Sequence, residues 1–231
     1  MRLALALLGL TLLSACNVVM TKTPLFTATD SAGAPTLRPG VWVFFKEPGC
    51  AVDESKPFAD WPDCSGGGIV SANELAGHKK GTPKDALERT PFVLASGDPR
   101  IGQVQITIDM SAGADASASG GGEASASVSV TQPKSQPYGY AAIRPTKLDP
   151  QGRIVAFASW PVLCGPPPPK DKDGNDTAMA TLHPLPGIEM KPGDAVCTTR
   201  SIPALRGAAK ASEAWADKPL SVAHWVRDGA R

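Results

Sequence analysis

The sequence predicts a mainly β protein, with a single antiparallel, barrel-like or curved-sheet domain and one C-terminal helix. Glycine and proline each number 23, which favours many turns and short strands over long helices. Charged residues make up only 19% of the chain, which argues against long surface helices. Runs of β-branched and aromatic residues recur, whereas a helical spacing of apolar residues appears once, near the C-terminus.

Four strands are predicted in the first half of the domain, which opens at Pro39-Gly40. They are residues 41–45, 69–70, 92–95 and 103–110. The first is a run of β-branched and aromatic residues that suits a buried strand. In the last, Val104, Ile106, Ile108 and Met110 alternate with polar residues from Gln103 on, which places the apolar side chains on one face of a half-buried strand.

Residues 111–136 form an Ala, Ser and Gly tract with almost no large side chains. Such a segment cannot offset the entropy of its ordering by burial. We expect a long, low-complexity loop at about these positions.

The second half of the domain is predicted to contain a hairpin, a helix and a closing strand. Residues 138–143 and 154–160 are strand-like, and Asp149-Pro150-Gln151-Gly152 has the composition of a turn between them. A stiff polyproline stretch follows at 166–169. Apolar residues then recur at helical spacing from Ser201 to about Trp215, and residues 220–227 alternate as a strand.

The N-terminus carries a short apolar run that ends in a cysteine. Arg2 precedes apolar residues 3–12, and Leu13-Ser14-Ala15-Cys16 follows. This arrangement resembles the signal sequence and lipobox of bacterial lipoproteins. About a dozen apolar residues are also too few to span a bilayer. The resemblance implies that residues 1–15 are a signal peptide and that Cys16 carries a diacylglyceryl thioether and an acylated amine. The alternative is an ordinary signal peptide with a conventional cleavage site.

The same resemblance implies a location for the mature chain. Asn17 stands where a retention signal usually has Asp, so we expect a lipid anchor at the periplasmic face of the outer membrane. Residues 16–38 are small, polar and proline-punctuated, and they predict a flexible, lipidated tether. Residues 39–231 then form the globular domain.

Four further cysteines predict two disulfides, because an even number in an oxidising compartment usually forms pairs. They are Cys50, Cys64, Cys164 and Cys197. Three pairings are open, and Cys50 with Cys64 and Cys164 with Cys197 is favoured because each pair is local in the chain. A four-thiolate zinc site is disfavoured, since the sequence has no close C-x-x-C pairs.

Several chemistries are disfavoured by the sequence. The chain has 23 basic and 22 acidic residues, which gives no net field to hold nucleic acid. His78, His183 and His224 are not at ligand spacing, and no G-x-S-x-G elbow occurs. Residues 171–176 are rich in Asp, but their spacing lacks the glycine and glutamate of a calcium loop. We therefore predict no enzyme activity, metal or cofactor.

A resemblance to the lipocalins appears at three places. Gly40-Val41-Trp42 matches their G-x-W in the first strand, and Arg200 precedes the helix where those proteins carry an arginine that packs on the tryptophan. A helix then precedes the last strand. The resemblance implies an antiparallel barrel with a ligand pocket near Trp42 and Arg200.

Two functional hypotheses follow. The first is a lipid-anchored cell-envelope lipoprotein with a non-enzymatic interaction or structural role, whose partners are the membrane and an envelope protein. The alternative, implied by the lipocalin resemblance, is a carrier of a small apolar ligand. A core filled by side chains would favour the first, and an interior pocket would favour the second.

Overall fold

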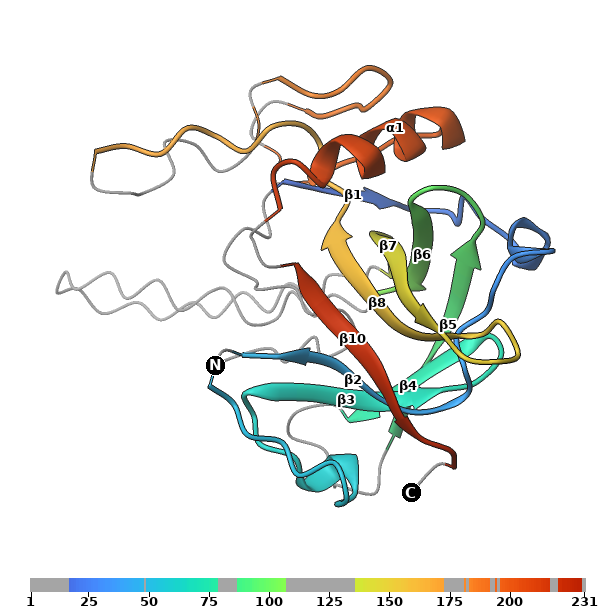
Figure 1. The fold of residues 1–231 in the computed structure, drawn as a ribbon. Coiled ribbons are helices and arrows are strands. Elements are labelled where there is room, and N and C mark those ends of the chain that lie inside the picture. Colours follow the sequence, from blue (N-terminus) through green and yellow to red (C-terminus); the bar gives the residue numbers. More distant parts are fainter. Residues whose placement is uncertain are drawn as a thin grey trace, which may run out of the picture.

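A computed structural model describes residues 17–47, 49–78, 87–106, 136–172, 181, 183–191, 194, 196–216 and 220–229. Within them, eight strands form a closed antiparallel barrel, which confirms the predicted fold class. These strands are β2 (Gly40–Lys46), β3 (Ser65–Val70), β4 (Glu74–His78), β5 (Leu87–Ala95), β6 (Arg100–Gln105), β7 (Tyr138–Leu148), β8 (Ile154–Pro161) and β10 (Ser221–Arg227). Each pairs with the next in this order, and β10 pairs with β2 to close the barrel (Figure 1).

The predicted β7–β8 hairpin is present, and the two strands pair along their length. Its turn is held by Asp149, whose carboxylate accepts the backbone N–H groups of Gln151 and Arg153 at 3.0 and 2.8 Å. The predicted strands at residues 41–45, 69–70, 92–95 and 220–227 are also present, and they belong to β2, β3, β5 and β10.

The barrel interior is a hydrophobic core, which we call the interior cluster. On β2, Trp42 and Phe44 point into the barrel, whereas Val41 and Val43 point outward into a different cluster. The Trp42 ring centroid lies 6.3 Å from that of Phe44 and 5.6 Å from that of Phe157. The buried members of the interior cluster are Leu37, Trp42, Phe44, Val70, Leu75, Phe92, Leu94, Val104, Ile143, Ile154, Phe157 and Ala223.

Glycine makes room for aromatic rings and for barrel closure. Strand β3 is longer than the predicted strand at residues 69–70, because it begins at Ser65 and includes Gly66, Gly67 and Gly68. A Cβ at Gly66 would overlap the Phe45 ring, and one at Gly67 would overlap the Trp61 ring. Gly40 has a positive φ of 131°, and a Cβ there would overlap the Arg227 carbonyl oxygen on the neighbouring strand β10.

A second layer covers the outer face of β6, β7 and β8. It contains β1 (Val18–Thr21), β9 (Val196–Cys197), the helix α1 (Ile202–Ser212) and the loops around them. α1 begins at an N-cap serine, Ser201, whose side chain accepts the Ala204 N–H, and it ends three residues before the predicted position at Trp215. The Trp160 ring fastens α1 to β8, because its Nε1 donates to the Ala209 carbonyl at 2.8 Å.

The prediction of a flexible tether at residues 16–38 is wrong for residues 17–38, which pack on the domain. Val18–Thr21 forms β1, which pairs antiparallel with β7 and parallel with β9. Val19 and Phe26 are buried in the second-layer core, and Leu37 belongs to the interior cluster. The segment is fixed because individual apolar residues are buried in both cores. These residues follow no helical or strand periodicity, so the sequence did not reveal their burial.

Gln103 secures this N-terminal segment. Its side chain was expected to face solvent, but it is only 3% exposed, because the segment covers the outer face of β6. The Gln103 Oε1 accepts the N–H groups of Leu25 and Phe26 at 2.8 and 2.9 Å, and its Nε2 donates to the Phe26 carbonyl at 2.9 Å. One side chain thus satisfies three backbone groups, two of which form buried hydrogen bonds and one a partly buried bond.

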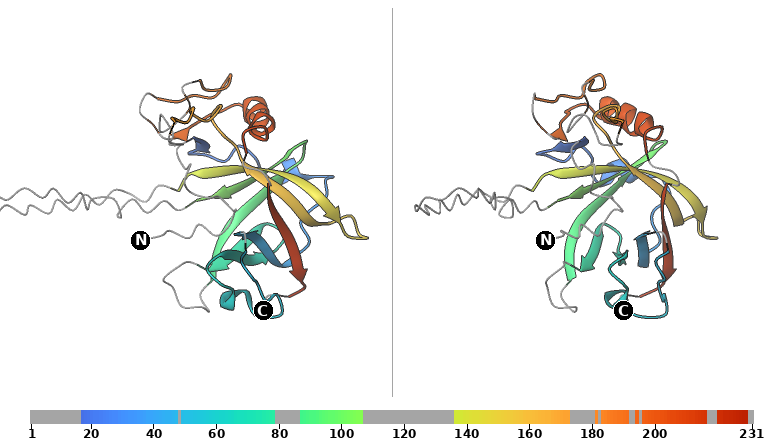
Figure 2. Two further views of the ribbon diagram at one scale, coloured as in Figure 1. Left: turned by 60° about the vertical axis from the view of Figure 1, so that its left-hand side comes forward. Right: turned by 90° about the vertical axis from the view of Figure 1, so that its left-hand side faces the viewer.

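A smaller layer covers the outer face of β2. The loop from Cys50 to Cys64 contains the 3₁₀ turn η3 (Phe58–Asp60), and its Trp61 packs against Val41 and Val43. A further 3₁₀ turn, η2 (Ala28–Ser31), precedes β2. Figures 1 and 2 show α1 and the orange loops at one end of the molecule and η3 at the other.

Part of the predicted strand at residues 103–110 and most of the low-complexity tract lie outside the described residues. β6 ends at Gln105, and Ile106 packs against the interior cluster as the alternation predicts. Residues 107–135 are not described.

Substitution Gln103→Leu is expected to destabilise the domain by at least about 2 kcal/mol, because it leaves buried N–H and C=O groups without partners. Urea unfolding of the soluble Cys16→Ser form measures this change. Gln105→Leu is the matched control, since Gln105 lies on the same face of β6 and bonds only to the Gln136 side chain among the described residues. Equal effects of the two substitutions would contradict the proposed role of Gln103.

Candidate functional site

The barrel interior is where a ligand pocket was predicted, and Trp42 lies at its centre. The Trp42 side chain is 0% exposed. Its Nε1 donates to the Arg38 carbonyl at 2.8 Å, so the polar atom of the buried ring is satisfied within the chain. Phe44 and Phe157 pack on its ring system. Trp42 is therefore a core residue, with no free polar group to offer a ligand.

Arg38 and Trp225 lie together just before β2 and on β10. The Arg38 guanidinium carbon lies 3.6 Å from the Trp225 ring centroid, a cation–π contact. Arg38 also forms an ion pair with Asp228 at 3.0 Å, and Trp225 Nε1 donates to the Pro39 carbonyl at 3.0 Å. Trp225 packs against the interior cluster, so the guanidinium covers the cluster at this point.

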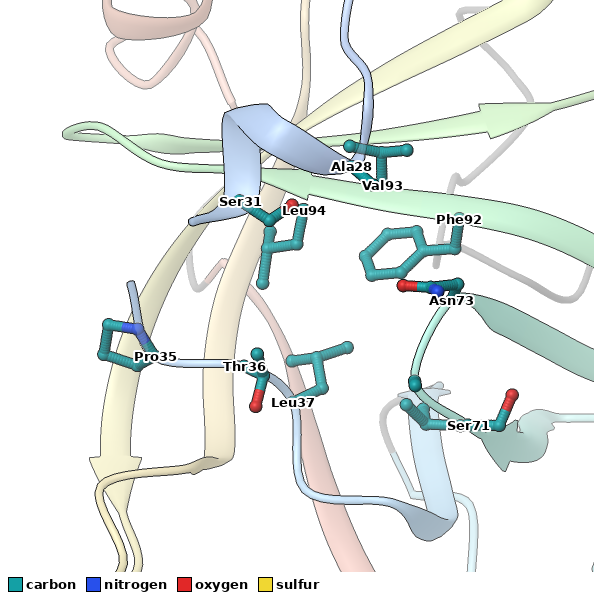
Figure 3. A pocket seen from close by; sticks show the side chains of 12 residues that line it. Ala28, Ser31, Pro35, Thr36, Leu37, Ser71, Asn73, Phe92, Val93 and Leu94 are labelled. Carbon is teal, nitrogen blue, oxygen red and sulfur yellow. The ribbon is translucent and has the colours of Figure 1, made fainter. Parts of the chain in front are cut away.

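A small cavity lies beside the interior cluster, between η2, the β3–β4 turn and β5 (Figure 3). Its volume is about 70 Å³. Leu37, Phe92 and Leu94 supply apolar walls, and Ser71 and Asn73 stand at its edge. Pockets for drug-sized ligands measure roughly 300–1,000 Å³, so this cavity can hold water or a single small group.

A second hollow adjoins the cavity at residues 70–72. It is a shallow surface depression of about 350 Å³ that opens to solvent. Its walls also include Pro39, Gly40 and Asp228. Neither hollow is lined by Trp42 or Arg200.

The structure does not bring Trp42 and Arg200 together. Arg200 is exposed next to Ser201, the N-cap of α1. α1 packs on the second-layer core outside the barrel, whereas Trp42 is enclosed in the interior cluster. The arginine–tryptophan contact that the lipocalin resemblance implies for Arg200 and Trp42 is therefore absent. A different arginine, Arg38, contacts a different tryptophan, Trp225.

The predicted disulfides Cys50–Cys64 and Cys164–Cys197 are both present, with Cα–Cα distances of 5.8 and 5.9 Å. These bonds overturn the alternative of a four-thiolate zinc site. Cys50–Cys64 closes the loop over β2. Cys164–Cys197 joins the segment after β8 to β9, inside the second layer.

The absence of a metal site stays a prediction, and the structure adds a finding for the part of the chain that it describes. There, no three His, Cys, Asp or Glu side chains are grouped so that they could hold a metal ion. His224 Nε2 lies 2.8 Å from Glu54 Oε1, and His183 is exposed. The His78 side chain and most of residues 171–182, the Asp-rich segment, lie outside the described residues.

Two further buried polar side chains on the barrel wall escaped the sequence analysis. Arg100 is 5% exposed and donates to the Pro35 carbonyl, and burial lowers the pKa of its guanidinium. The Tyr140 hydroxyl lies 2.5 Å from Thr21 Oγ1 on β1. Burial raises the pKa of the Tyr140 phenol. Both side chains fix the N-terminal segment, and neither lines the small cavity or the surface depression.

The predicted signal peptide and Cys16 lie outside the described residues. Among the residues that are described, the structure contains no helix with the length and apolarity needed to cross a bilayer.

Comparisons with protein-family models, curated proteins and solved structures find no match to this chain. Within the described residues, the likeness to lipocalins comprises the closed eight-stranded barrel, the place of Gly40-Val41-Trp42 on its first strand and the helix α1 before the last strand β10.

Substitution Trp42→Ala is expected to lower the free energy of unfolding by about 3–5 kcal/mol, because it opens a cavity in a filled core. Trp225→Ala is the control and should cost less, since the Trp225 side chain is partly exposed. Urea unfolding of both variants measures the difference. A small effect of Trp42→Ala would mean that the interior is loosely packed, as a ligand-binding barrel would be.

Proposed function

We propose that this protein is a lipid-anchored lipoprotein of the cell envelope that acts through contacts on its outer surface. The anchor is Cys16, acylated after removal of residues 1–15, and the location is the periplasmic face of the outer membrane. The proposal draws on the Leu13-Ser14-Ala15-Cys16 motif for the anchor. It draws on the packing of the barrel for the mode of action.

The filled interior is the observation that carries the proposal. Trp42, Phe44 and Phe157 occupy the centre of the barrel, and the adjoining cavity measures about 70 Å³. A filled interior among the described residues supports a role for the outer surface or for the protein as a structural element. No reaction is proposed, and the expected partner is another protein of the envelope.

The second candidate is a carrier of a small apolar ligand. The closed eight-stranded barrel is compatible with a lipocalin-like architecture, and this observation favours the candidate. The ligand would bind in the small cavity lined by Phe92 and Leu94 or in the open depression beside it, since Trp42 is enclosed by other side chains. The cavity is small and the depression is open to solvent, which makes this the weaker proposal.

The anchor is tested by expressing the full chain in a diderm bacterium and separating the envelope. The protein is expected in the outer-membrane fraction, with an N-terminal peptide whose mass includes a diacylglyceryl group and an amide-linked acyl chain on Cys16. The Cys16→Ser variant should be released as a soluble periplasmic protein. An unmodified Cys16 in the wild-type chain would refute the anchor.

The mode of action is tested by native mass spectrometry of the soluble Cys16→Ser form, purified without detergent. We expect the mass of the bare polypeptide, lowered by four protons for its two disulfides. A denaturing measurement of the same sample is the control. Extra mass that is lost on denaturation would identify a bound ligand and establish the carrier instead.

A further inference from the structure

We infer that the second layer around Asn17 is a membrane-docking face and that its partner is the lipid bilayer. The inference rests on the proposed acylation of Cys16. We call this surface the anchor face, and it comprises the described parts of residues 163–172, 183–191 and 196–201. The lipid would then hold the barrel directly on the membrane in one orientation, without an intervening tether.

Asn17, the residue next to Cys16, is locked into the fold. It is 4% exposed. Its side-chain Nδ2 donates to the Gly165 carbonyl at 3.1 Å, and its Oδ1 accepts the Thr181 N–H at 3.3 Å. Its own carbonyl accepts the Cys164 N–H at 2.8 Å. Backbone and side chain are thus both fixed.

The two segments that hold this part of the chain are themselves joined covalently. Val18 lies opposite Leu163 on one side and Val196 on the other. The disulfide Cys164–Cys197 links those two flanking segments. The start of the described chain is therefore set in a cross-linked sheet, which resists displacement of Asn17.

The distance from this fixed point to the lipid is short. Consecutive Cα atoms lie about 3.8 Å apart. Because Asn17 is fixed, Cys16 must stay close to the anchor face. A flexible tether over residues 16–38 would have allowed tens of ångströms, at roughly 3.3–3.6 Å for each extended residue. With residues 17–38 packed, the acyl chains must enter the bilayer next to the anchor face.

The exposed charges of the anchor face are of both signs, so the surface alone would bind the membrane weakly and the lipid would provide most of the affinity. Its exposed basic residues are Lys170, Lys172, Lys191 and Arg200, and its exposed acidic residues are Asp171 and Glu189. Asp194, which is also exposed, lies next to it in sequence. Charges of both signs give little net attraction to anionic headgroups. Val196 is 37% exposed, a large apolar side chain beside β1. Orientation would therefore come from the position of the anchor.

This geometry also assigns the opposite end of the barrel to the periplasm. The loop from Cys50 to Cys64 and the last described residues lie at the end away from α1 and the orange loops (Figures 1 and 2). The loop is braced against β10, since Arg227 Nη2 donates to the Lys56 carbonyl at 2.8 Å and His224 pairs with Glu54. A partner protein would reach this rigid end without approaching the bilayer.

The orientation can be tested by nuclear magnetic resonance of the acylated full chain in nanodiscs of phosphatidylethanolamine and phosphatidylglycerol. Headgroup-linked gadolinium is expected to broaden amide signals of residues 163–165, 170–172 and 196–201 several-fold more than those of the non-proline residues in 50–64. The control is the acylated chain with a Gly/Ser linker after Cys16, begun with Asn to keep the residue that follows the cysteine. In this control the difference should disappear, because the folded domain is no longer held at one face.

The outcomes separate the two proposals. A chain without acyl groups by mass would refute the proposed function. An acylated chain that binds the nanodisc but shows equal broadening at both ends would refute the anchor face and leave the proposed function standing. Stronger broadening of residues 50–64 than of residues 196–201 would also overturn the inference, since the opposite end of the barrel would then face the bilayer.

Discussion

The pairing of β10 with β2 is the constraint on which the rest of the structure depends. It joins the two ends of the eight-stranded sheet and removes the open edges that an unclosed sheet would expose. Its register sets Trp225 opposite Trp42, and Gly40 permits the close approach that a side chain would block. Closure also turns the inward side chains of all eight strands toward one axis. An eight-stranded barrel is just wide enough for side chains to fill it or for one small ligand, and in this chain Trp42, Phe44 and Phe157 fill the interior that closure creates.

Closure leaves the outer faces of several strands to be covered, and the two coverings have different origins. The second layer is built from both termini, because β1 comes from the start of the described chain and α1 from near its end. Gln103 and Tyr140 join the first of these to the barrel through buried hydrogen bonds. The layer on β2 is local, since one disulfide loop brings Trp61 onto Val41 and Val43. Each disulfide lies in one covering, where short or irregular segments have few backbone bonds of their own.

The sequence allowed most of the barrel to be predicted, and the physical reasons for success and failure are distinct. β2, the β7–β8 hairpin and α1 carry periodic apolar patterns or turn residues, so local rules found them. The disulfides were found because each pair is close in the chain. β1 was missed because it is four residues long and its burial depends on partners at residues 138–139 and 196–197. The strand role of Gly66–Gly68 depends on rings at Phe45 and Trp61, and no local pattern shows this. The lipocalin resemblance predicted that Arg200 packs on Trp42. This prediction failed because the three-residue motif at Gly40-Val41-Trp42 does not determine which face of the barrel the helix after Arg200 covers.

The packed N-terminal segment changes what a lipid anchor would mean for this protein. Asn17 would serve two requirements, as the residue that follows the acylated cysteine and as a buried side chain that both donates and accepts hydrogen bonds. A carboxylate at this position would face the Gly165 carbonyl without a proton to donate, so sorting and folding would depend on the same amide. A protein anchored in this way has little freedom to search away from the bilayer. Its partners must come within the height of one barrel above the membrane, and the surface available to them is the end that carries the Cys50–Cys64 loop.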